Sequence, residues 1–305
     1  MDRQPPSAAF LDMSTFVENI RALKPRTRWT IFAGVATIAL IVTALLKPIP
    51  QPQYYHHFAD TRTLFGLANA GDVLSNLPFL AVGAVGLYFA LRKKSALTQD
   101  HSTQDHLTQD RLNKDRLNKD QQWAYATMFA GLVLTCFGSA YYHLAPDNSR
   151  LVWDRLPMTV AMAGLIGALL TDRFGAKSVR IMPLIAAIGI GTVIQWGLSE
   201  EHGNGDLRWY AFYQGMVMIT AVAMLVLFRS QREGTREFVI AAIANFAAKM
   251  FELADKPIFA LGGVVSGHTL KHLSAGLGFI PLVLLLAQTG KQRTTEDAEE
   301  RRESV

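Results

Sequence analysis

Three histidines in this chain have the residue type and spacing of a catalytic metal site. His268 and His272 lie four residues apart in segment 266–273, so a helix would place both rings on one face. A third histidine, His143, ends an earlier apolar run. Neutral imidazoles are good zinc ligands, and three protein ligands leave one position for water. The pattern predicts a zinc site held by His143, His268 and His272.

Two further residues have the spacing expected of groups that assist hydrolysis. Ser139 precedes His143 by four residues, and Asp154 follows it after a turn at 145–149. Pro157 suits the first turn of the next helix, which would bring Asp154 back to the level of His143. A water activated by zinc near neutral pH is a nucleophile. Asp154 is then the candidate general base, and Ser139 the candidate donor to a developing oxyanion.

Each of these residues also has an ordinary structural interpretation. A histidine at a membrane interface can hydrogen-bond a carbonyl, and a small residue such as Ser139 often packs transmembrane helices. Asp154 can be an interfacial charge paired with Arg155. The combination is more specific than any member, because ionisable groups inside a membrane are costly and usually functional.

The elements that must position these residues are apolar runs. The chain has 305 residues, of which 50% are hydrophobic, and its polar residues concentrate in both tails and one long loop. This distribution predicts an all-α polytopic membrane protein. The only cysteine is Cys136, which excludes a disulfide framework and a cysteine metal site. The net charge of +5 reflects basic residues clustered in alternate loops, so no nucleic-acid partner is expected.

Eight runs approach the roughly 20 residues that cross a bilayer. We expect spans at 29–46, 72–91, 123–143, 155–170, 181–198, 210–228, 238–254 and 268–288. Tails at 1–28 and 291–305 flank these runs. Between the second and third runs is a low-complexity loop, 92–122, built on a five-residue repeat that we interpret as a solvated linker.

Loop charge predicts the orientation of the spans. With eight spans, the basic clusters of the N-terminal tail and of alternate loops all fall on one side, together with the C-terminal tail. The positive-inside rule therefore places both termini in the cytoplasm. The same count places His143, Asp154 and His268 together near the outer face.

Other polar residues have less specific patterns. His56 and His57 are adjacent and cannot share a helix face, so they are expected to be loop residues. In the seventh span, Glu252 can pair with Lys249 or with Lys256. A structural ion pair is the favoured interpretation there, and a contact to a polar group of the substrate is the alternative.

The combined pattern resembles the alkaline ceramidase family. The shared features are Ser-x3-His at the end of one span, Asp eleven residues later, and His-x3-His on the last span, and the resemblance covers roughly residues 60–290. It implies a seven-helix hydrolase domain at 60–290, with 29–59 as an extra N-terminal transmembrane helix and loop. It also implies that His143, His268 and His272 are zinc ligands and that Asp154 and Ser139 assist. Family members also carry an acidic calcium-binding segment, but the matching stretch here has only Asp60, Asn69 and Asp72. Calcium prefers six to eight oxygens, so a strong calcium site is not expected.

These observations predict a zinc-dependent hydrolase that cleaves a lipid amide inside the membrane. The resemblance implies ceramide-like N-acyl sphingolipids, cleaved to fatty acid and sphingoid base. Two alternatives stay open: a lipid ester or phospholipid hydrolase, and a receptor-like protein in which zinc is structural. A transporter is disfavoured, because no inverted repeat is evident. The sequence does not determine the oligomeric state.

Overall fold

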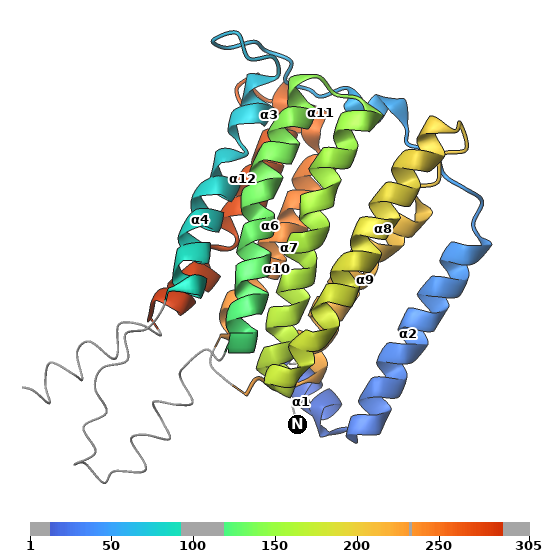
Figure 1. The fold of residues 1–305 in the computed structure, drawn as a ribbon, viewed down its shortest axis with the longest axis vertical. Helices are drawn as coiled ribbons and strands as arrows, with labels where there is room; N and C mark the ends of the chain where they lie inside the picture. Colours follow the sequence, from blue (N-terminus) through green and yellow to red (C-terminus); the bar gives the residue numbers. More distant parts are fainter. Residues whose placement is uncertain (1–12, 93–118, 232–233, 289–305) are drawn as a thin grey trace, which may run out of the picture.

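The computed structural model describes residues 13–92, 119–231 and 234–288, and these residues form a bundle of α-helices without a β-strand (Figure 1). The predicted all-α fold is confirmed. Most of the predicted loop at 92–122 and the tail beyond 290 lie outside the described residues. The predicted N-terminal tail holds a short helix, α1, at Met13–Ala22.

The helices follow the predicted spans closely, although several begin earlier. The elements are α2 (Pro25–Leu45), η1 (Gln53–His56), α3 (Ala70–Leu74), α4 (Leu77–Leu91), α6 (Lys119–Leu144), α7 (Asn148–Phe174), η2 (Ala176–Ile181), α8 (Met182–Glu201), α9 (Arg208–Leu227), α10 (Thr235–Leu253), α11 (Asp255–Ala260) and α12 (Gly267–Leu277). Helical residues resume after α12, and the last apolar segment runs from Gly267 to Gln288.

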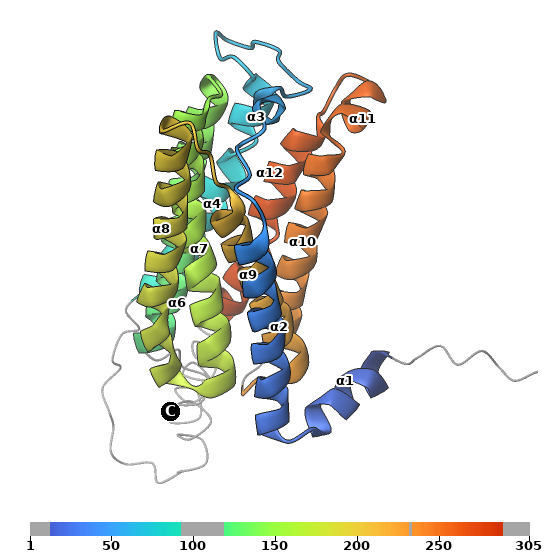
Figure 2. The same cartoon turned by 90° about the vertical axis from the view of Figure 1, so that its right-hand side faces the viewer.

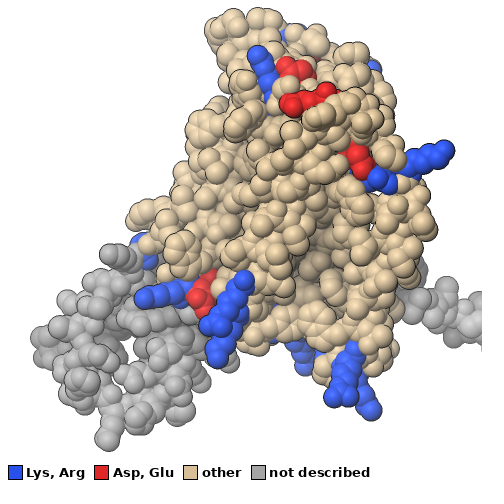
Figure 3. Space-filling model, turned by 45° about the vertical axis from the view of Figure 1, so that its right-hand side comes forward, with Lys and Arg blue, Asp and Glu red and all other residues tan. Residues whose placement is uncertain are grey.

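Six of these segments are long and apolar enough to cross a membrane, so the chain is a multi-pass membrane protein by length and composition. They contain α2, α3 with α4, α6, α8, α9 and α12. The other two predicted spans correspond to α7 and α10, which run beside them in the bundle (Figure 1). Charged side chains gather toward the two ends of the molecule, with an uncharged band between them (Figure 3).

The helices at the centre of the bundle approach closely through glycines. A Cβ atom at Gly131 of α6 would collide with the backbone of Ala161, and one at Gly164 of α7 would collide with the backbone of Met128. Small residues allow this close approach of membrane helices. The contact fixes α6 against α7, the two helices that carry His143, Ser139 and Asp154.

The start of α7 differs from the prediction. Asp147 caps the helix by accepting a hydrogen bond from Arg150 N at 2.7 Å, so Asp154 lies in the second turn and not at the entrance. Pro157 is consequently inside the helix. A proline removes the hydrogen bond to the carbonyl four residues earlier, here that of Trp153. Gly138 of α6 packs directly on that carbonyl, where a larger residue would clash.

The N-terminal helices lie at the edge of the bundle. Helix α2 packs beside α9, and α1 lies at the end of the bundle opposite α3 and α11 (Figures 1 and 2). Arg21 donates to the carbonyls of Leu225 and Val226, and Arg28 donates to the carbonyl of Leu227 at 2.7 Å. These carbonyls end α9 and have no helical partner of their own, so the two arginines cap it.

Candidate metal centre

The three predicted histidine ligands meet at the end of the bundle formed by α3, α11 and the start of α12. Their ring centroids are 4.8–4.9 Å apart in all three pairings, a nearly equilateral arrangement. Each residue offers a ring nitrogen within 4.8 Å of the others, and all three side chains are buried. This is a possible three-histidine metal site, and the arrangement alone does not identify the metal.

Hydrogen bonds define which nitrogen of His272 faces the centre. Its Nδ1 lies 2.8 Å from Ser75 Oγ and 3.2 Å from the carbonyl oxygen of Asp72. The Ser75 hydroxyl itself donates to that same carbonyl, so it accepts from His272. Nδ1 therefore carries the hydrogen, and Nε2 keeps a free lone pair for a metal.

The other two histidines have ring nitrogens that lack any partner. His143 Nδ1 and His268 Nε2 are fully buried, and neither has a hydrogen-bond partner among the described residues. An unpaired buried polar atom is costly, so such atoms call for an explanation. A cation between the three rings would accept both lone pairs, and the residues present therefore fit a bound zinc.

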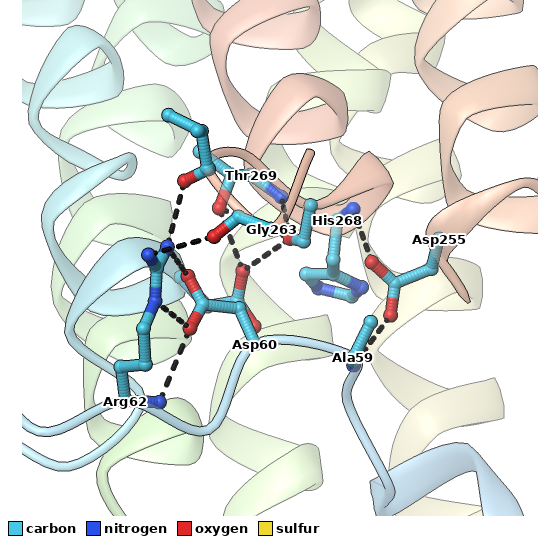
Figure 4. A network of polar contacts seen from close by, with 10 residues as sticks. Ala59, Asp60, Arg62, Asp255, Gly263, His268 and Thr269 are labelled. Carbon is cyan, nitrogen blue, oxygen red and sulfur yellow. Dashed lines mark hydrogen bonds and ion pairs between the residues drawn. The ribbon is translucent and has the colours of Figure 1, made fainter. Parts of the chain in front are cut away.

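The backbone around both histidines is fixed by polar side chains. Asn69 donates to the carbonyl of His143 at 2.8 Å. Asp255 accepts from the backbone N–H of His268 and, through its other oxygen, from that of Ala59 (Figure 4). The hydroxyl of Ser266 caps α12 by accepting from Thr269 N. The start of α12 is thereby held rigidly beside the incoming loop.

The loop before α3 covers the centre. The ring of Phe58 lies 4.7 Å from that of His143 and 4.6 Å from that of His268. His56 was predicted to be a loop residue but ends the short 3-10 helix η1, and its two ring nitrogens lie 2.9 Å from Tyr142 Oη and from Asn148 Oδ1. The predicted boundary at residue 59 thus falls within a segment that packs on the site.

In the stretch that corresponds to the family's calcium segment, Asp60 and Asn69 are bound within the protein, whereas Asp72 Oδ2 is buried without a hydrogen-bond partner among the described residues. Arg62 binds both oxygens of Asp60, which holds the pKa of that carboxyl below its usual value. The same guanidinium donates to the carbonyls of Gly263 and Val264, as Figure 4 shows in part. Arg62 therefore occupies an oxygen-rich position where a cation would be expected, and it ties the loop to the entrance of α12.

Asp154 and Ser139 lie together beside the histidines. Ser139 lies close enough to Asp154 to interact with its carboxylate, both side chains are buried, and both line the same cavity. Arg155 points elsewhere: it donates to Gln51 at 2.7 Å, and its guanidinium lies 4.1 Å from the centre of the Trp196 ring. Asp154 is therefore not paired with Arg155 by a hydrogen bond.

A cavity of about 150 Å³ begins at this group and runs through the bundle. Ser139, Asp154, Lys271 and His272 line one end, and mostly apolar side chains line the rest, together with Thr135, Gln214 and Asn245. The segment of α7 from Asp154 to Leu169 covers about 22 Å at roughly 1.5 Å per residue. That length exceeds half of a bilayer core, roughly 15 Å.

Sequence reasoning missed Lys271. Its Nζ lies 2.7 Å from Glu252 Oε1, while the other oxygen of Glu252 binds Lys249. The predicted pair of Glu252 with Lys249 is therefore present, whereas the second partner is Lys271 and not Lys256. The sequence did contain a signal for Lys271: a lysine between two candidate ligands inside an apolar span is energetically costly and is therefore expected to have a function.

We compared the chain with known protein families. No family model matches it, and no curated protein is significantly similar to it. The functional argument therefore depends on the geometry of the centre and on the motif resemblance.

Proposed function

We propose that this protein is a zinc-dependent hydrolase that cleaves an amide bond of a membrane lipid. The observation that carries the proposal is the position of the three histidines: they converge on one point, and His272 also lines the polar end of a largely apolar cavity. A structural metal site is usually closed by a fourth protein ligand, whereas a catalytic site keeps one position open. Among the described residues, no fourth histidine, cysteine or carboxylate joins the group.

His143, His268 and His272 would hold the metal. When bound, zinc supplies a Lewis acid and lowers the pKa of a coordinated water toward 7. The chain's own contribution is preorganisation. Ser75 and the Asp72 carbonyl fix the tautomer of His272, and Phe58 limits the access of bulk water to His143 and His268.

Asp154 is the residue suited to move the proton. It lies at the cavity end together with His272, and Ser139 orients its carboxylate. In amide hydrolysis it would take a proton from the attacking water and return it to the leaving nitrogen. The C–N bond breaks, a C–O bond forms, and a fatty acid and an amine leave. Ser139 acts in this scheme by positioning Asp154.

The cavity indicates the class of substrate. Its mostly apolar walls suit part of a hydrocarbon chain, and its polar end suits the scissile group. The resemblance to alkaline ceramidases adds the amide bond and a ceramide-like N-acyl sphingolipid as the expected substrate. An ester or phospholipid with the same chain would fit the cavity equally well, so the test must include those lipids.

The experiment uses purified protein in detergent, measured for metal content and offered a panel of ceramides, acyl esters and phospholipids. We expect about one zinc per chain and release of fatty acid from ceramide, detected by mass spectrometry. The His272→Ala variant and a chelator should abolish release, whereas His202→Ala, a change at an exposed histidine, should not. Cleavage of esters alone would replace the amide assignment. Stoichiometric zinc without any product would favour a receptor-like protein with structural zinc.

We also propose that both termini face the cytoplasm and that the centre lies near the outer face. Cys136 is the only cysteine and is buried, so single introduced cysteines report accessibility without background. An impermeant maleimide should label Asn204→Cys in intact cells and should label Lys177→Cys only after lysis, since these exposed residues lie in oppositely placed loops. The reverse pattern would invert the orientation.

A further inference from the structure

Lys271 is a partly buried cation at the polar end of the cavity, and the proposed hydrolysis has not yet used it. It stands between two metal-ligand candidates on α12 and lines the cavity with Asp154 and His272. Its side chain is 19% exposed. An ammonium group inside a membrane bundle is expensive to keep, so its retention calls for a function.

The neighbours of Lys271 hold it in place without using all its donors. Glu252 Oε1 accepts from Nζ at 2.7 Å and from Tyr55 Oη at 3.0 Å. Glu252 is the only hydrogen-bond acceptor of Nζ among the described residues, although an ammonium group has three N–H donors. Two donors are therefore available to an oxygen atom inside the cavity. Asp154 lies near enough for its charge to interact with that of Lys271.

Glu252 does not depend on Lys271 alone for a positively charged partner. It also binds Lys249, which is 61% exposed and does not line the cavity. Removing Lys271 therefore leaves the carboxylate with a cation and the hydroxyl of Tyr55. The two lysines form a matched pair, because both neutralise one glutamate and only one of them reaches the cavity.

We propose that Lys271 binds the acyl oxygen of the lipid: the carbonyl oxygen of the substrate and the carboxylate of the fatty-acid product. The catalytic part of this inference rests on the proposed hydrolysis. As water adds to the carbonyl carbon, negative charge develops on that oxygen, and a hydrogen bond from the ammonium stabilises it without transferring a proton. Among the described residues that line the cavity, Lys271 is the only lysine or arginine, so it is the charged donor that the cavity offers for this purpose.

The ligand class follows from the same geometry. A long chain fits the apolar cavity, and its polar end must carry an oxygen acceptor to meet Lys271. A fatty acid should therefore bind more tightly than the fatty alcohol of equal length, because a carboxylate accepts a charge-assisted hydrogen bond. This preference for the fatty acid over the fatty alcohol depends on Lys271 and does not require the metal.

The kinetic test compares Lys271→Met, Lys271→Arg and Lys249→Met. Lys271→Met should lower kcat about 100-fold or more, with KM and metal content nearly unchanged, because the lost donor acts in the transition state. Lys271→Arg keeps a cationic donor and should recover part of the rate. Lys249→Met should behave as wild type. A fully active Lys271→Met variant would overturn the catalytic role.

The binding test separates this inference from the proposed function. A diazirine-bearing fatty alcohol labels the cavity, and oleate and oleyl alcohol compete with it, with and without chelator. Wild type and Lys249→Met should prefer oleate about 10-fold or more, and Lys271→Met should lose that preference in both conditions. If this binding preference is found but no lipid is hydrolysed, the proposed hydrolase function is refuted and the role of Lys271 in binding the carboxylate stands. A preference unaffected by Lys271→Met would refute the role of the lysine.

Discussion

The two ends of the helix bundle both bury charged and polar side chains, but they satisfy them differently. At the end that holds α1, Arg21, Arg28 and Arg173 donate to backbone carbonyls near the end of α9. One nitrogen each of Arg28 and Arg173 also lacks a hydrogen bond at that end, but both guanidinium groups have other partners and neither residue lines the cavity. At the opposite end, His143 Nδ1 and His268 Nε2 are buried without a partner, and Lys271 keeps donors toward a cavity. Buried polar groups that cap the end of a helix have a structural role. Buried polar groups that have no partner and lie around a cavity are available to bind a ligand.

The largest effect is expected from substitutions that remove one of the three histidine ligands. Replacing His143, His268 or His272 with alanine leaves two imidazoles, which should reduce bound zinc from about one equivalent per chain to nearly none and abolish hydrolysis. Metal analysis by mass spectrometry checks this without an activity assay. A His272→Ala protein that retains its zinc would show that the three rings do not form the site.

The next effect separates chemistry from metal binding. Asp154→Asn should lower kcat by about 10²–10⁴ with zinc content unchanged, because the amide cannot take the proton from water. Ser139→Ala should have a smaller effect, since it only positions Asp154. Thr135→Val is the control: Thr135 lines the same cavity, but its hydroxyl bonds the carbonyl of Gly131. Steady-state kinetics on the preferred lipid measure these effects. An Asp154→Asn variant with the wild-type kcat would refute the role of Asp154 as general base.

A smaller change is expected from the residues that orient the histidines. Ser75→Ala removes the partner of His272 Nδ1 and should weaken zinc binding by about 10–100-fold while the helices stay folded. Competition with a chromogenic chelator measures the affinity. Ser178→Ala, whose hydroxyl bonds a carbonyl at the opposite end, should leave the affinity unchanged. Equal affinities for the two variants would mean that Ser75 does not support the site.

The smallest effect should appear at the opposite end. Arg21→Met or Arg28→Met uncaps α9 and should lower the free energy of unfolding by about 1–3 kcal/mol, with zinc content and kinetics unchanged. Arg26→Met, at an exposed arginine of α2, is the matched control. Thermal unfolding in detergent measures the difference. A loss of zinc in Arg21→Met would contradict the separation of the two ends.

Much of the fold was predictable because a bilayer imposes length and apolarity on each span. The eight predicted runs correspond to long helices, and the three candidate ligands do converge. The boundaries were less predictable. Pro157 looked like a helix start, yet α7 begins at Asn148, because Gly138 lets a neighbouring helix pack on the carbonyl that proline leaves unpaired. The partner of Glu252 was likewise missed, since Lys271 comes from another helix.

The sequence by itself determined which residues can do chemistry: His143, His268 and His272 by type and spacing, with Ser139 and Asp154 nearby along the chain. Local periodicity is enough for this, because residues four apart share a helix face. Only the tertiary structure decided what each residue touches. Ser75 orients His272, Arg62 donates to the carbonyls of Gly263 and Val264, and Lys271 reaches the cavity. These contacts join segments far apart in the chain, and packing, not spacing, brings them together.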